Sequence, residues 1–324
     1  MAKLFIYLPT YNRPDSLRTQ LSVLLPQIKE LSTNVRLMIC DNASEKYKKE
    51  DVLRDLPTMA NVEIRQNGGN IGANANIALG FVFAQPDEFL WILSDNDIVS
   101  PNAVAYLLTM LDPAVDFYCF VNGSESAQDV QHKWIDGCQV PMDWRMGLIS
   151  DALYNMSSVK DVVEQAFYFH NSSFPHLAVA FAAARKKEVT RFRLLPRQKV
   201  SADEESSMEQ PTDYSLARVC MPLLVPLFPK WEAKSFSRKW LWAHGVQLHI
   251  NKSKHPHLYI QSNATLRHYG GWGATVILWG TEFAAILAKP YLNKRQAIVQ
   301  KLKKHLSSSN LRRAQHVRSF FCGK

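Results

Sequence analysis

Short apolar segments alternate with longer amphipathic or polar segments through the first 120 residues of the chain. The apolar segments are bounded by Pro, Gly, Asn or Asp, which is typical of buried strands in a sheet. They predict five strands, at residues 3–8, 35–40, 62–65, 89–93 and 115–121. The segments between them predict helices at residues 14–30, within 41–56, at 72–84 and at 101–111, the first opened by Pro14 and Asp15 and kinked near Pro26.

Strands that alternate with helices predict an α/β fold, with a mostly parallel central sheet flanked by helices. Such sheets bind ligands outside the carboxyl ends of their strands. Polar loops follow four of the predicted strands, at residues 10–13, 41–42, 67–72 and 95–97. We therefore expect these four loops to converge on one crevice.

The second half of the chain has a less regular pattern. Residues 122–146 predict loops with a short hairpin, residues 147–185 mostly helix, and the charged residues 186–213 a mobile excursion. Prolines at 222, 226 and 229 forbid a continuous helix there, and helices are expected from Ser235 onward. The predicted domains are residues 1–230 and a helical basic region, residues 231–324. The first domain divides into two halves, residues 1–121 and residues 122–230.

Composition places the chain among ordinary soluble proteins, since 47% of its 324 residues are hydrophobic and 21% are charged. Five scattered cysteines without a C-x-x-C pair argue against a disulfide framework or a zinc site. The early turn at the start of the chain argues against a signal peptide. We therefore expect a cytosolic protein, in which residues 272–292 form a buried or interfacial helix rather than a membrane span.

The net charge of +9 belongs to the C-terminal part of the chain, because ten Lys or Arg and no Asp or Glu follow Glu282. Such a distribution suits a membrane surface or a nucleic acid.

Two aspartates, Asp95 and Asp97, follow the apolar segment 89–93 and are separated by one residue. In an extended segment both side chains point to the same side, and their mutual repulsion suggests an intervening cation. Mg²⁺ and Mn²⁺ prefer oxygen ligands, and Mg²⁺ is usually held by one or two carboxylates and substrate phosphates. The alternative is that both aspartates only cap the following turn and helix.

Four segments, PTYNRPD, ICDNAS, NGGNIGANAN and WILSDNDIVSP, occur in this order, each after a predicted strand. This ordered set resembles the family 2 glycosyltransferases over roughly residues 3–110. The resemblance implies a GT-A fold, a nucleotide-diphosphate sugar as donor, with a UDP-sugar favoured, and a divalent metal, Mn²⁺ or Mg²⁺. It also implies an inverting transfer to a glycan or polyprenyl-linked acceptor. Residues 1–230 would then be the catalytic domain, with its nucleotide-sugar half in residues 1–121 and its acceptor half in residues 122–230.

The resemblance also implies roles for individual residues. Thr10 and Tyr11 would flank the nucleotide base, Asp41 would accept a hydrogen bond from it, and Asp95 would bind the ribose. Asp97 would bind the metal, with Asp95 beside it and Asn96 in the middle position. The remaining candidate donor-binding residues are Pro9, Arg13, Asn70, Gly72 and Asn76. The alternative for Arg13, with equal weight, is an exposed residue near a helix start. The alternative for Asn70 and Asn76 is a capping role.

The chain lacks a clear Glu-Asp pair where the family has its catalytic acid. The general base therefore has to be sought among other residues. His176, near the predicted start of a helix after Pro175, occupies about that place, and Asp151 is the second candidate. An imidazole titrates near neutral pH and suits proton transfer. The alternative for His176 is a packing or capping role.

The resemblance further implies synthesis of bacterial surface polysaccharide or lipopolysaccharide, by an enzyme peripheral to the inner face of the cell membrane. Residues 289–324 support membrane binding, because their apolar residues recur at spacings of three and four among basic ones. A helix packed on the catalytic domain is the equal alternative.

Three other classes compete with a glycosyltransferase. A nucleotidyltransferase of similar fold would want a glycine-rich, basic first loop. A nonenzymatic module that reads nucleic acid would not cluster acids, so we expect no nucleic-acid partner. The glycines at 68, 69 and 72 only faintly resemble a dinucleotide-binding loop, and they follow the third strand instead of the first.

Overall fold

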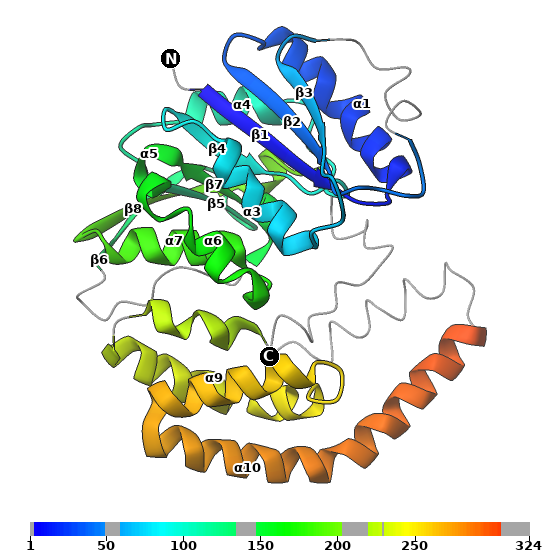
Figure 1. Ribbon diagram of the computed structural model, residues 1–324, viewed down its shortest axis with the longest axis vertical. Coiled ribbons are helices and arrows are strands. Elements are labelled where there is room, and N and C mark those ends of the chain that lie inside the picture. Colours follow the sequence, from blue (N-terminus) through cyan, green and yellow to red (C-terminus); the bar gives the residue numbers. More distant parts are fainter. Residues whose placement is uncertain (1–2, 49–58, 134–146, 203–219, 229, 306–324) are drawn as a thin grey trace.

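The computed structural model describes residues 3–48, 59–133, 147–202, 220–228 and 230–305. An eight-stranded sheet lies between helices in one part of the molecule, and a layer of long helices lies below it (Figure 1). The α/β fold predicted from the alternating pattern is confirmed.

The strands are β1 (Lys3–Thr10), β2 (Val35–Asp41), β3 (Val62–Gln66), β4 (Glu88–Ile92), β5 (Phe117–Val121), β6 (Gln128–Lys133), β7 (Ala152–Asn155) and β8 (Val189–Pro196). Their order across the sheet is β3-β2-β1-β4-β7-β5-β8-β6. β3, β2, β1 and β4 are parallel, whereas β7 runs antiparallel between β4 and β5, and β6 runs antiparallel to β8. The carboxyl ends of the first four strands therefore meet at one edge.

The helices of the sheet domain are α1 (Pro14–Glu30), α3 (Ala73–Phe83), α4 (Ala103–Met110), α5 (Met156–Val159), α6 (Gln165–Tyr168) and α7 (Pro175–Arg185), with short 3₁₀ turns among them. The predicted helices at 14–30, 72–84 and 101–111 are confirmed to within two residues at each end. The polar helix expected within 41–56 falls largely outside the described residues.

Strand β1 is apolar on both faces, and this burial explains why the sheet has helices on both sides. Leu4, Ile6 and Leu8 point into a core shared with α1 and α4. Phe5 and Tyr7 point into the opposite core, which α3 and α7 cover. The two faces alternate because successive side chains of a strand point in opposite directions.

Residues 147–185 are mostly helical, as expected, but they also contain the strand β7. The prediction was wrong for residues 186–213, which were expected to be an excursion and contain β8. The strand expected within a local hairpin, β6, pairs instead with β8. β7 is only four residues long, which leaves no alternating pattern to detect.

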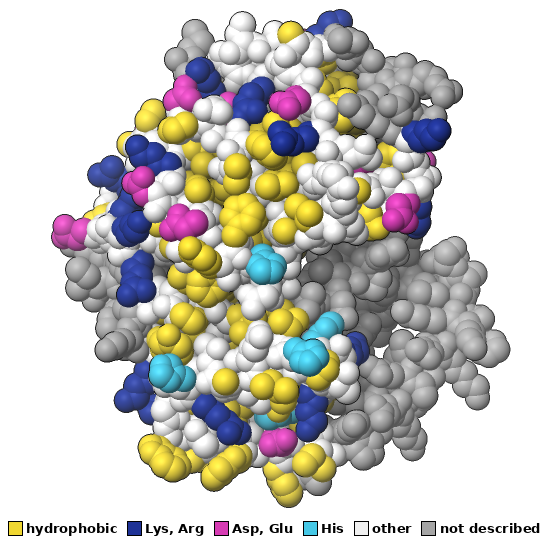
Figure 2. Space-filling view, in the orientation of Figure 1, with side chains coloured by type: hydrophobic (Ala, Val, Ile, Leu, Met, Phe, Trp, Pro, Cys, Tyr) yellow, Lys and Arg dark blue, Asp and Glu magenta, His cyan; other side chains and the backbone are white. Residues whose placement is uncertain are grey.

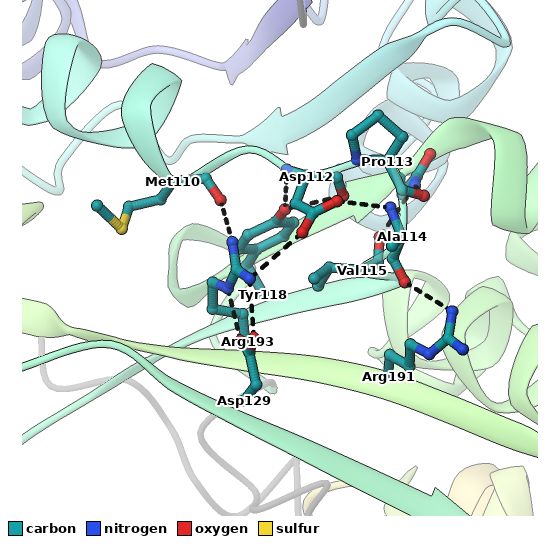
Figure 3. A network of polar contacts seen from close by, with 10 residues as sticks. Met110, Asp112, Pro113, Ala114, Val115, Tyr118, Asp129, Arg191 and Arg193 are labelled. Atoms are coloured by element: carbon teal, nitrogen blue, oxygen red, sulfur yellow. Dashed lines mark hydrogen bonds and ion pairs between the residues drawn. The ribbon is translucent and has the colours of Figure 1, made fainter.

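Strand β8 contains basic residues, which a sequence pattern predicts to face solvent. One of them, Arg193, nevertheless donates hydrogen bonds to three residues (Figure 3). Its Nε donates to Asp129 on β6 at 2.6 Å, and its Nη1 donates to the carbonyl of Met110 at 2.7 Å, at the end of α4. Asp112 is the third acceptor, at 3.4 Å. Arg193 thus ties the β6–β8 edge of the sheet to α4.

The lower layer follows the 3₁₀ helix η7 (Met221–Leu227) and consists of α9 (Lys230–Ile250) and α10 (Pro256–His305). Phe228 joins the two parts, since its ring lies 4.8 Å from that of Phe181 on α7 and 5.0 Å from that of Phe236 on α9. Gly271, at φ 63°, breaks the regular conformation of α10. Within the described residues, neither α9 nor α10 nor any other helix has the length and hydropathy of a membrane span.

Candidate active site

The loop after β4 carries the two aspartates and is held at the carboxyl edge of the sheet. The amide of Leu93 donates to the carbonyl of Tyr7 on β1 at 2.9 Å, and Asp95 follows two residues later. β4 is entirely buried, so the chain leaves the core only at Ser94. The aspartates therefore lie at the rim, as the alternation of strands and polar loops predicts.

Asp95 is buried and interacts with the loop that follows β1. Thr10 Oγ1 donates to Asp95 Oδ2 at 2.8 Å, and Arg13 Nη1 donates to Asp95 Oδ1 at 3.0 Å. Burial raises the pKa of Asp95, while the Arg13 guanidinium and the Thr10 hydroxyl oppose this shift. Arg13 is half-exposed, so its guanidinium faces both the carboxylate and solvent.

Asp97 is half-buried and is held by a residue from a distant part of the chain. Ser150 Oγ donates to Asp97 Oδ2 at 2.5 Å and accepts from the amide of Ser94 at 2.9 Å. Ser150 belongs to the short turn that precedes β7, and its carbonyl accepts from Trp91 Nε1 on β4 at 2.8 Å. One serine thus fixes both ends of the loop 94–97.

The loop after β2 lies beside the loop after β1. The amide of Asn42 donates to the carbonyl of Thr10 at 2.9 Å. Asp41 is buried, and its Oδ1 accepts from the amide of Ser44 at 3.1 Å and from Ser44 Oγ at 2.5 Å. Gln66 Nε2 donates to the other oxygen of Asp41 at 3.2 Å. These contacts fix the orientation of the Asp41 carboxylate at the carboxyl end of β2.

Residues 9–12 connect β1 to α1 across this rim. Pro9 still belongs to β1 and pairs with Cys40, whereas Tyr11 is 37% exposed. Asn12 has a φ of 58°, and its side chain accepts from the amides of Glu45 and Lys46. The ring of Tyr11 is therefore available to a ligand on the surface of the rim.

A cluster of asparagine side chains shapes the loop between β3 and α3. Asn67 Nδ2 donates to Asn42 Oδ1 and to Asn76 Oδ1, both at 3.0 Å, and Asn42 Nδ2 donates to Asn70 Oδ1 at 2.8 Å. Asn70 Oδ1 also accepts from the amide of Gly72, whose φ of 86° favours glycine. Asn70 and Asn76 therefore have structural roles here, and their contact with a donor stays a prediction.

The two candidates for the general base lie in different environments. His176 is 1% exposed, on the first turn of α7 within the hydrophobic core, 6.2 Å from the Phe174 ring. Asp151 is 4% exposed, and its Oδ1 accepts from Arg197 Nε at 3.0 Å. Asp151 lines a small pocket together with Asp97. Neither assignment is tested by these contacts, and both stay predictions.

Asp95 and Asp97 are the predicted metal ligands at the rim, and this role stays a prediction. Within the parts of the chain that the structure describes, no group of three His, Cys, Asp or Glu side chains is placed to hold an ion. Asp95 and Asp97 offer oxygen ligands alone, as hard divalent cations prefer, and such ions are often held by one or two carboxylates and substrate phosphates. The residues therefore fit a divalent ion whose remaining ligands come from a diphosphate and water.

Sequence reasoning missed Ser150, Asn67 and Arg197. Ser150 lies 53 positions from Asp97, in a segment without a motif, so no local signal identifies it. Asn67 opens one of the four predicted loops, but its contacts with Asn42 and Asn76 depend on the parallel pairing of β2 and β3.

Residues 5–161 match the sequence profile of glycosyl transferase family 2. The abequosyltransferase RfbV of Salmonella typhimurium (strain LT2) is 31% identical to this chain over 113 residues, which cover 34% of this chain and 33% of that enzyme. The aligned segment therefore spans about a third of that relative's length.

Solved structures share the fold at low sequence identity. S. aureus TarS 1–349 in complex with UDP superposes with a TM-score of 0.55 at 14% identity, over 88% of this chain and 92% of that one. Its complex with UDP-GlcNAc gives 0.53 at 13% identity over the same shares. The Pyrobaculum calidifontis mannosyltransferase PcManGT, with GDP-Man and Mn²⁺, gives 0.50 at 13% identity, over 90% and 82%.

The fold similarity confirms the GT-A-like architecture with a helical C-terminal region. The profile match, the curated relative and the shared fold agree, and they favour a glycosyltransferase over the competing classes. The profile match over residues 5–161, the curated relative and the shared fold together support a glycosyltransferase of the family 2 type.

Proposed function

We propose that the enzyme transfers a sugar from a nucleotide-diphosphate donor, most simply a UDP-sugar, to a glycan or polyprenyl-linked acceptor, with inversion at the anomeric carbon and with a divalent metal. The observation that carries the proposal is the meeting of three loops at one edge of the sheet. Thr10 and Arg13 contact Asp95, and the backbone of Asn42, beside Asp41, bonds to Thr10.

The nucleotide would lie over the ends of β1 and β2. The buried carboxylate of Asp41 can accept a hydrogen bond from an N–H of the base, and the exposed ring of Tyr11 can pack against it. Pro9 and Thr10 border the same position at the end of β1. Asp95, which follows the adjacent strand β4, would accept hydrogen bonds from the ribose hydroxyls.

The diphosphate would lie between Arg13 and Asp97. A guanidinium binds phosphate oxygens through directed hydrogen bonds, and that of Arg13 is half-exposed. Asp97 and Asp95 would hold Mn²⁺ or Mg²⁺, which when bound offsets the charge that develops on the departing diphosphate. Asn96, between them, supplies a neutral side chain and leaves two carboxylates for the ion.

The transfer requires a base that takes the proton from the acceptor hydroxyl as its oxygen attacks the anomeric carbon and the bond to the diphosphate breaks. Of the two candidates we favour Asp151, because it follows Ser150, which contacts Asp97, and lines a pocket together with Asp97. Both candidate side chains are buried, so either would have to become accessible before an acceptor could reach it.

The relatives support a role in the synthesis of bacterial polysaccharide, and we propose that this synthesis takes place at the inner face of the cell membrane. One is named as an abequosyltransferase, and the superposed enzymes bind UDP, UDP-GlcNAc or GDP-Man. The proposal covers the donor class and leaves the transferred sugar to measurement.

Thermal unfolding with nucleotides tests the donor site. We expect UDP to raise the melting temperature of the intact chain with Mn²⁺ and much less without it, since a ligand that binds only the folded state stabilises it. The Asp97→Ala variant is expected to lose the metal-dependent part of the rise. Asp87→Ala is the matched control, because Asp87 is an exposed carboxylate paired with Lys3.

An equal rise with and without metal would contradict the proposed role of Asp97. A panel of nucleotide sugars with the same readout then identifies the donor, and the absence of any rise across the panel would contradict the proposed function itself.

A further inference from the structure

Helix α10 has two apolar faces after its break at Gly271. Ala274, Leu278 and Ala285 are buried and form the first face, which packs with Leu241 and Leu248 of α9. The two helices approach closely, since a Cβ atom on Gly245 of α9 would lie 2.7 Å from the side chain of Thr281. This first face attaches the part of α10 after Gly271 to α9.

The second face is exposed to solvent. Five large apolar side chains recur there at spacings of four, three, four and three residues: Trp272 (83% exposed), Val276 (61%), Trp279 (59%), Phe283 (65%) and Ile286 (63%). At about 100° per residue, their mean direction lies about 140° from that of the buried face. A helix that is apolar on opposite sides is normally covered on both.

The exposed apolar surface extends beyond this row. Trp242 on α9 is 81% exposed, and Ile260, in the first part of α10, is 63% exposed. Figure 2 shows hydrophobic side chains along the lower edge of the molecule, where Figure 1 places α10. We call the five residues Trp272, Val276, Trp279, Phe283 and Ile286 the α10 apolar face.

The charge of the same helices indicates what covers this face. Residues 230–305, which make up α9, α10 and their connection, contain 13 Lys and Arg and only Glu232 and Glu282 as acids. Two copies of this chain joined through α10 would bring these positive helices together, and their repulsion opposes such a dimer. An anionic surface would attract them.

The residue types point to the same occupant. Three of the five side chains are Trp or Phe, and tryptophan is favoured at the boundary between lipid headgroups and acyl chains. Interfacial helices bury such a face in the boundary while basic residues contact anionic lipids.

We propose that the α10 apolar face inserts into the surface of an anionic lipid bilayer. The interaction needs no membrane-spanning segment and no donor, and the side chains that insert are other than the basic residues 289–324. Where the proposed polyprenyl-linked acceptor is correct, it would also bring the enzyme to the surface from which that acceptor projects.

Vesicle sedimentation of the intact chain tests this proposal. We expect binding to vesicles of phosphatidylcholine with phosphatidylglycerol, and much weaker binding to phosphatidylcholine alone. The double variant Trp279→Gln, Phe283→Gln should lower the partition into anionic vesicles by at least about tenfold, since burial of each large apolar side chain in the bilayer favours the bound state. Both residues are largely exposed, and an unchanged melting temperature confirms that the variant folds.

The matched control is Val82→Gln, Tyr168→Gln, which removes two exposed apolar side chains from α3 and α6. This control should bind vesicles as the unmodified chain does. The proposal is overturned if the intact chain does not bind anionic vesicles, or if the α10 variant and the control lose binding equally. It is also overturned if light scattering shows that the intact chain is a dimer and the α10 variant is a monomer, while the variant still binds vesicles.

Donor binding is read separately, from the UDP-dependent rise in melting temperature. Loss of vesicle binding with that rise intact concerns the α10 apolar face alone. Loss of the rise in the unmodified chain concerns the donor site.

Discussion

Ser150 Oγ lies 2.5 Å from Asp97 Oδ2 and accepts a hydrogen bond from the amide of Ser94, 2.9 Å away. The serine therefore connects the turn before β7 to the loop after β4, between segments that β4–β7 pairing brings together. An oxygen ligand on a loop is effective only when its orientation is maintained before the ion arrives. Ser150 supplies that orientation to Asp97.

Replacement of Ser150 by alanine removes this hydrogen bond without adding bulk. Hydrogen bonds to charged groups contribute about 1.5–3 kcal/mol, so we expect Ser150→Ala to raise the Mn²⁺ concentration needed for half of the UDP-dependent thermal shift by about tenfold. The matched control is Ser158→Ala, because Ser158 donates a comparable hydrogen bond to Asp116 elsewhere in the domain. An equal change in both variants would show that Ser150 acts only on stability.

The pair Arg13 and Asp95 allows a double-mutant cycle in the absence of any donor. Arg13→Gln leaves a buried carboxylate with Thr10 as its remaining side-chain donor, and we expect it to lower the free energy of unfolding by about 1 kcal/mol, a value reduced for the exposure of Arg13. In the Asp95→Asn background the same change should have little effect.

Urea unfolding measures each corner of this cycle. Arg18→Gln is the control, because Arg18 pairs with the highly exposed Asp15 and such pairs contribute little. Additive effects of Arg13→Gln and Asp95→Asn would contradict a direct interaction between the two side chains.

Proton transfer from the acceptor distinguishes Asp151 from His176. We expect Asp151→Asn to reduce kcat by about 10²–10⁴-fold with an unchanged UDP-dependent thermal shift, since a general base contributes that range and acts after donor binding. We expect His176→Gln to lower the melting temperature and to leave kcat largely intact, because His176 is enclosed by the core.

Single-turnover assays at saturating donor give the two rates. A large loss of kcat in His176→Gln alone would reverse the assignment. If neither variant loses kcat, the base lies elsewhere, and the sequence between Ala202 and Cys220 contains five further carboxylates.

The first half of the fold was predictable because each strand ends at a strong turn signal. Residues after β1, β2 and β4 are polar and closely follow buried apolar segments, so the boundaries and the shared edge follow from the pattern alone. β8 was not predictable in this way, since Arg191 and Arg193 interrupt its apolar residues. The acceptors of Arg193 lie on β6 and at the end of α4, far away in sequence.

The residues of the candidate site differ in the same way in how far the sequence predicts their positions. Thr10, Asp41 and Asp95 lie in loops whose positions the parallel strands determine, and the contacts among these loops confirm their convergence. Ser150 and Arg197 reach the site through pairing that no local pattern encodes. His176 sits at the start of a helix as predicted, but α7 packs so closely on the sheet that its first turn is buried as well.

The stability of the C-terminal helices is expected to depend on pH through His249. This side chain is buried between α9 and α10, where Nε2 lies 3.2 Å from the carbonyl of Leu278 and Nδ1 lies 2.6 Å from Tyr259 Oη. A neutral ring that donates from Nε2 and accepts at Nδ1 satisfies both partners. Burial lowers the pKa of His249 from the ordinary value of 6.5, and Glu282 partly opposes this shift.

Because the folded-state pKa is below the unfolded one, the unfolded chain binds the proton more readily. The free energy of unfolding therefore receives its full contribution from this group above about pH 6.5 and loses it as the pH falls through the folded-state pKa. We expect the melting temperature to fall more steeply below pH 6.5 in the unmodified chain than in His249→Gln. His257→Gln is the control, since His257 is an exposed histidine on the same helix layer. Parallel pH curves for the unmodified chain and His249→Gln would assign the acid sensitivity to other groups.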